Sequence, residues 1–146
     1  MDQAFKSQLK SLIISHEGFR NYPYTDSVGK VTIGIGYNLT DRGMPDDWIN
    51  DRYDKDMTWF DEHLALDYPW YVDLCDARRM VLLDMCYNMG YKTFQTFHKL
   101  IFALELRNYD KAADEILRSE RSHQALTRSQ QNADMMRSGE LCSQVA

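Results

Sequence analysis

One segment near the middle of the chain restricts the fold more than any other. The run ARRMVLLDMCYNM, residues 77–89, is apolar over most of a helical circumference and ends at Gly90. A helix that is apolar nearly all round has to be buried, so other elements must surround it. Asp76 is a plausible N-cap and Gly90 a plausible stop. The segment therefore predicts the central helix of a mainly α protein.

Further helices are predicted on both sides of this segment. Asp2 is expected to cap a first helix that ends near Ser15 or Glu17, before Gly18. A later helix, marked by Met57, Phe60, Leu64 and Tyr68, is expected to end before Pro69. Three more are predicted, for residues 96–106, residues 109–118, and a last helix that Thr127 caps and that ends before Gly139.

Residues 22–38 break the helical pattern. They are rich in aromatic and β-branched residues around Asp26-Ser27-Val28-Gly29-Lys30, which predicts a hairpin turn. The stretch KVTIGIGYN, residues 30–38, is interpreted as one strand with Thr32, Gly34 and Gly36 on a nearly bare face. Glycine inside a strand marks a bulge, tight packing or the close approach of a ligand, and these interpretations stay open here. Residues 38–43 are interpreted as a loop.

Length and composition are typical of one ordinary domain. The chain has 146 residues, of which 44% are hydrophobic. No apolar run approaches the roughly 18 residues of a membrane span, and no signal peptide is recognised, so we expect a soluble protein made in the cytoplasm. Cys75, Cys86 and Cys142 are odd in number and lack a CxxC spacing, so free thiols are expected.

Charge is unevenly distributed along the chain. Residues 41–76 contain eleven Asp or Glu side chains against three Arg or Lys, and we interpret this acidic block as a solvated surface. No calcium-loop pattern occurs within it. No basic footprint is present either, so nucleic acid is not an expected partner.

Several common site motifs fail at one position each. HExxH would need histidine at Arg20, and GxGxxG would need glycine at Leu39. No GxSxG occurs. Metal-dependent hydrolysis, dinucleotide binding and a serine nucleophile are therefore not predicted.

Three residues remain as candidates for chemistry. Glu17 is an acid at the C-terminal end of a predicted helix, where the macrodipole disfavours a carboxylate, although a solvated side chain would also explain it. Asp26 lies in the hairpin, where turn chemistry alone is a sufficient explanation. Thr32 is the polar side chain of the glycine face. Two carboxylates are the minimum for glycoside hydrolysis.

The same residues resemble a known signature. Glu17-Gly18-Phe19-Arg20, Tyr24-Thr25-Asp26 and Thr32-Ile33-Gly34-Ile35-Gly36 are similar to the motif of the phage-type lysozymes, the endolysins and T4 lysozyme-like muramidases. The resemblance continues through residues 76–90, 108–113 and 137–139. It implies a mainly α (α+β) lysozyme-like fold, in which a small β-hairpin lobe of about residues 15–68 and a larger helical lobe of about residues 1–14 and 69–146 flank a cleft within one domain.

The resemblance also implies an activity. These glycoside hydrolases are muramidases, which cut the β-1,4 bond between N-acetylmuramic acid and N-acetylglucosamine in peptidoglycan with inversion. Glu17 would be the general acid, while Asp26 and Thr32 would hold and activate a water. No metal or cofactor, and no membrane or protein partner, is implied, so a monomer is expected. The enzyme would be made in the host cytoplasm and reach the cell wall after holin-type release.

Four further residues are expected to bind substrate. Gly34 would let the glycan approach the strand, and Arg128 falls where the family places an arginine against the catalytic glutamate, although an ordinary exposed residue is the alternative. Tyr87 and Asn88 match a cleft-lining pair. A tyrosine on the core helix packs by default, so Asn88 is favoured, because a polar residue on an apolar helix needs a partner.

Two other functions stay open. A lytic transglycosylase uses one glutamate and leaves an anhydro sugar, and Asp26 and Thr32 argue against it. A catalytically weak or inactive peptidoglycan-binding protein is the alternative from another class, although such a protein has no use for the acid.

Overall fold

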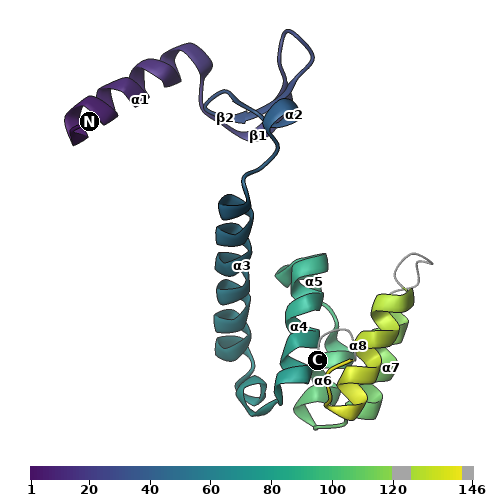
Figure 1. Ribbon diagram of the computed structural model, residues 1–146. Coiled ribbons are helices and arrows are strands. Elements are labelled where there is room, and N and C mark those ends of the chain that lie inside the picture. Colours follow the sequence, from purple (N-terminus) through teal and green to yellow (C-terminus); the bar gives the residue numbers. More distant parts are fainter. Residues whose placement is uncertain (120–125, 143–146) are drawn as a thin grey trace. The chain divides into compact units, whose positions relative to one another are not determined.

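The computed structural model describes residues 1–119 and 126–142, and the chain divides into two compact units, Met1–Arg52 and Tyr53–Ala146. Figure 1 labels most of the helices and strands of both units. The first unit contains the small sheet, whereas the second is helical. The lobe boundaries expected from the sequence, near residues 15 and 68, stay a prediction, as does the cleft.

The first unit begins with α1, Gln3–Glu17. The Asp2 side chain accepts a hydrogen bond from the Phe5 backbone N–H at 2.8 Å, which confirms the predicted N-cap, and Gly18 follows the last helical residue as expected. The helix buries no side chain. Four of its large apolar residues are exposed by more than a third; they are Phe5, Leu9, Leu12 and Ile13.

A three-stranded antiparallel sheet follows, with strands β1 (Arg20–Thr25), β2 (Val31–Gly34) and β3 (Tyr37–Asn38) in that order. The predicted hairpin between β1 and β2 is confirmed. The prediction of one strand over residues 30–38 is wrong, because the chain turns back after Gly34 and Ile33 pairs with Tyr37. Gly34 and Gly36 both have a φ of 68°, a conformation that is strained for any residue with a Cβ.

The segment interpreted as a loop contains a short helix, α2, Leu39–Arg42. Asn38 caps it, since its Oδ1 accepts a hydrogen bond from the Asp41 N–H at 3.0 Å. Beyond α2, the Tyr37 hydroxyl donates to the Gly43 carbonyl, and its ring lies 4.9 Å from that of Trp48 between centroids. Trp48 belongs to the first turn of α3, Asp46–Asp67, so this aromatic contact joins the sheet to that helix.

The second unit is a set of helices that matches most of the sequence-based predictions. One correction concerns α4, whose N-cap is Cys75 rather than Asp76. Another is that a short helix over Tyr91–Phe94 was not predicted, whereas the helix predicted over residues 96–106 is confirmed as His98–Glu105. A third is that Thr127 lies inside the last helix instead of capping it. After α3 the elements are the 3-10 helix η1 (Pro69–Asp73), α4 (Asp76–Met89), α5 (Tyr91–Phe94), α6 (His98–Glu105), α7 (Tyr109–Ser119) and α8 (Leu126–Ser138).

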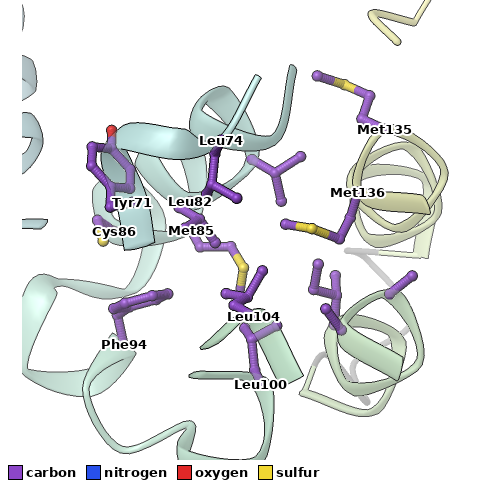
Figure 2. Close-up of a cluster of buried hydrophobic side chains, with 14 of the residues drawn as sticks. Tyr71, Leu74, Leu82, Met85, Cys86, Phe94, Leu100, Leu104, Met135 and Met136 are labelled. Atoms are coloured by element: carbon purple, nitrogen blue, oxygen red, sulfur yellow. The ribbon is translucent and has the colours of Figure 1, made fainter. Parts of the chain in front are cut away.

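The core of this unit forms around α4, as the sequence predicted. Figure 2 shows Met85, Leu104 and Met136 converging from α4, α6 and α8. Burial is nevertheless confined to one side of α4, since Met80 and Tyr87 are exposed by 42% and 51%. No helix among the described residues is long and apolar enough to cross a membrane. The three cysteines are free thiols.

Arg78 of α4 fixes the end of α8. Its Nε donates to the Met136 carbonyl at 2.9 Å and its Nη2 to the Arg137 carbonyl at 3.2 Å, while the guanidinium lies 3.5 Å from the centre of the Tyr109 ring of α7. The carbonyls of a last helical turn lack helical partners and carry the negative end of the dipole, so a cation there is stabilising. The contact explains why glycine occurs at position 139, where a Cβ would approach the guanidinium to 3.1 Å.

Arg78→Met is expected to lower the free energy of unfolding by about 2–3 kcal/mol, because it removes two hydrogen bonds from a charged donor. Arg107→Met is the matched control, since Arg107 makes an exposed ion pair with Asp73 at 3.0 Å and should cost less than about 1 kcal/mol. Urea unfolding of both variants measures the difference. Equal losses would show that the Arg78 contact does not hold α8.

Candidate active site

The strand register brings Asp26 and Thr32 to one face of the sheet. Tyr24 pairs with Thr32 and Thr25 with Val31, so the next residues along, Asp26 and Lys30, face each other across the hairpin. Side chains alternate along a strand, and therefore Asp26, Lys30 and Thr32 share a face. Asn38 of β3 pairs with Thr32 and lies on the same face. The sequence predicted the alternation in β2 correctly.

Asp26 closes the hairpin with one carboxylate oxygen. Its Oδ1 accepts hydrogen bonds from the Val28 N–H at 3.0 Å and the Lys30 N–H at 2.8 Å. The expected turn role of this residue is therefore confirmed. Within the part of the chain that the structure describes, no hydrogen bond reaches Oδ2. That oxygen is left to accept from a water or a ligand.

Thr32 is 4% exposed and is the one buried side chain among residues 1–52, all of which the structure describes. Its hydroxyl donates to the Lys30 carbonyl at 3.3 Å, which is long for an O–H donor. A hydroxyl also has two acceptor lone pairs, so the Thr32 oxygen can still accept a hydrogen bond from a water.

Glu17 ends α1 and reaches the turn between β2 and β3. It is exposed, and its side chain lies over Gly36 so closely that a Cβ there would come within 2.8 Å of Oε2 and 3.0 Å of Cγ. Of the interpretations left open for the glycines, tight packing against the first helix is thus confirmed for Gly36. A Cβ on Gly34 would have nothing within 4 Å, so its role toward a ligand stays a prediction.

The other candidates lie in the second unit. Tyr87 and Asn88 are both exposed on α4, and the Tyr87 ring meets that of Tyr53 edge-on at 5.8 Å between centroids. The reason for favouring Asn88 was wrong, because an exposed amide has water as its partner. A role in substrate binding stays a prediction for both residues.

Arg128 forms a bidentate ion pair that the sequence analysis did not name. Its Nη2 lies 2.6 Å from Oδ1 of Asp84 and its Nε 2.9 Å from Oδ2, and Asn132 donates to the same Oδ2 at 2.8 Å. Burial opposes ionisation of Asp84, but the hydrogen bonds from Arg128 and Asn132 hold its pKa below the ordinary value. The alternative of an ordinary exposed arginine is therefore wrong.

The Asp84 pair borders a cavity of about 400 Å³ within the second unit. Its lining is Tyr53, Met80, Asp84, Arg128, Gln131, Asn132, Met135 and Cys142. The sequence analysis did not single out Asp84. The signal that could have identified it is an acid inside an otherwise apolar helical run. Across the described residues, no group of three or more His, Cys, Asp or Glu side chains is arranged to hold a metal.

Among the described residues, eight α-helices and a small three-stranded antiparallel sheet form a mainly α protein of lysozyme-like fold. The model of the phage lysozyme family matches residues 14–132, which include Glu17, Asp26, Thr32 and all of the second-unit candidates. The chain belongs to the phage lysozyme family. No curated protein matches the chain at a significant level. Family membership assigns the chain to the peptidoglycan-lysing glycoside hydrolases in general.

Gly34 and Gly36 provide a matched pair for testing the Glu17 contact. Both have a φ of 68°, so alanine at either position should cost a similar strain of about 1–2 kcal/mol. Only at position 36 would the added Cβ meet Glu17. If Glu17 is catalytic, kcat of Gly36→Ala should fall roughly 10-fold to 100-fold, because a misplaced catalytic group can cost about 100-fold. If Gly34 borders the glycan as predicted, Gly34→Ala should mainly raise KM by crowding it.

The measurement is steady-state hydrolysis of soluble peptidoglycan strands, with thermal unfolding to confirm equal strain. The same kcat in both variants would show that the Glu17 position does not depend on Gly36.

Proposed function

We propose that the protein is a muramidase that hydrolyses the β-1,4 bond between N-acetylmuramic acid and N-acetylglucosamine with inversion. Glu17 protonates the leaving oxygen as general acid. Asp26 is the general base, and together with Thr32 it holds the attacking water on the opposite face of the sugar. An inverting enzyme needs room for that water between its two carboxyl groups.

The observation that carries this proposal is the hydrogen bonding of the two carboxylate oxygens of Asp26. Its Oδ1 is used by the hairpin, while Oδ2 is unbonded among the described residues and lies on the face that also presents Thr32. A base needs an acceptor of this kind within hydrogen-bond reach of the proton that it removes. Glu17 comes to the same small sheet from α1, through its contact with Gly36.

The remaining assignments complete the proposal. Gly34, Tyr87, Asn88 and Arg128 bind the glycan or its peptide stems, and the enzyme acts as a monomer without metal or cofactor. It reaches the bacterial cell wall after holin-type release. Arg128 would bind substrate as part of its ion pair with Asp84 rather than as an isolated cation.

Glu17→Gln should abolish cleavage while the fold is kept, because the amide has the same shape but no proton to give. Loss of a general acid costs at least about 100-fold. Product analysis of digested peptidoglycan should show new reducing ends on N-acetylmuramic acid with the wild type and none with the variant. NMR of early products should show the α-anomer.

The same assay separates the alternatives. Anhydro ends would identify a lytic transglycosylase, and retained binding without any cleavage by the wild type would identify a peptidoglycan-binding protein. Undiminished cleavage by Glu17→Gln would rule out Glu17 as the acid.

Asp26 can be tested separately for its turn role and its proposed chemical role. Asn in place of Asp26 still offers Oδ1 to the N–H groups of Val28 and Lys30, so the hairpin should survive while kcat falls at least about 100-fold. Asp26→Ala removes the turn bonds too and should additionally lower the free energy of unfolding by about 1–3 kcal/mol. Wild-type kcat in Asp26→Asn would leave the residue with a turn role alone.

A further inference from the structure

The side chain that faces Asp26 across the hairpin is a cation. Residues directly opposite each other in an antiparallel pair have Cβ atoms roughly 5 Å apart, within easy reach of a lysine stem. Lys30 therefore has the reach to bind the carboxylate of Asp26, and the negative charge of Asp26 does act on it. Such an ion pair would cover the oxygen on which the proposed chemistry depends.

Lys30 instead binds Asp41 of α2. Its Nζ lies 2.7 Å from Oδ1 of Asp41, and Asn38 donates to the other carboxylate oxygen at 2.9 Å. The hydrogen bond to Asp41 raises the pKa of Lys30, and the hydrogen bonds from Lys30 and Asn38 lower the pKa of Asp41. The pair is fixed to the sheet, because Asn38 both caps α2 and pairs with Thr32.

The position of the ammonium follows from a competition between two carboxylates. Exposed ion pairs are weak individually, and both partners here are partly exposed, at 38% for Lys30 and 52% for Asp41. The better-placed carboxylate therefore takes the cation. Asp41 has this advantage because α2 and Asn38 hold it in place, whereas Asp26 already uses one oxygen for the turn.

We propose that Asp41 is a positioning residue for Asp26: it holds the Lys30 ammonium away from Oδ2, so that this oxygen stays available to the attacking water. The proposal rests on the role of Asp26 as base given above. In this way α2, a short helix that touches no reacting atom, would keep the acceptor oxygen of the base free.

The test is Asp41→Asn in the full chain, assayed with soluble peptidoglycan strands at fixed ionic strength. The substitution removes the charge that holds Lys30 but leaves the backbone N–H that Asn38 accepts from. Lys30 should move to Asp26, and because a base contributes about 100-fold to 10,000-fold, blocking part of it should lower kcat at least about 10-fold with little change in KM.

Adding Lys30→Met should restore activity, because it removes the competing cation and keeps the N–H that binds Asp26. We expect kcat of Asp41→Asn/Lys30→Met to return to within about threefold of the wild type, because Asp26 would again be free to act as base. Asp47→Asn, which removes the same charge from the exposed first turn of α3, controls for net charge and should leave kcat unchanged.

Each outcome has a distinct meaning. Wild-type kcat in Asp41→Asn would overturn the proposal, and so would a double variant as slow as Asp41→Asn, which would indicate a purely structural role. Asp26→Asn separates these results from a failure of the proposed function: if that variant keeps wild-type kcat, Asp26 is not the base at all.

Discussion

The hydrogen bonds from Val28 and Lys30 to Oδ1 of Asp26 are the interaction on which the first unit depends. They close the hairpin and thereby fix the pairing of Tyr24 with Thr32. A slip of one residue would move Thr32 to the opposite face of the sheet. One carboxylate thus sets the register through one oxygen, and in the proposed mechanism it serves the chemistry through the other. Substituting it changes fold and activity together unless the acceptor oxygen is kept.

The predictions from sequence succeeded where a local signal has one meaning. Asp2 before an apolar repeat, and Asp26 to Lys30 between two β-rich runs, each predicted what the structure contains. Gly34 and Gly36 have two meanings, since alternation with glycine fits one long strand as well as two short strands around a turn. The helix α2 was missed because four residues are too few to show a period, although Asn38 is a favoured N-cap residue.

Burial decides which polar residue of a helix needs a partner, and sequence position alone does not give it. The same argument was available for Asp84 and Asn88, four residues apart on α4, and it was applied to Asn88. The structure leaves Asn88 exposed to water and places Asp84 between Arg128 and Asn132. The side chains that bind Asp84 come from α8, more than 40 residues further along the chain. No pattern within α4 identifies them.

The acidic block over residues 41–76 illustrates the same limit for charge. Interpreted as a solvated surface, it would consist of interchangeable carboxylates. Four of its members instead bind particular side chains: Asp41 binds Lys30, Asp61 accepts from Tyr71 and Arg79, Asp67 accepts from Tyr91 and Gln95, and Asp73 pairs with Arg107. Net charge describes the long-range field that a charged substrate meets. What each carboxylate does is set by the donor within hydrogen-bond distance, and for Asp41 that donor is the lysine opposite the proposed base.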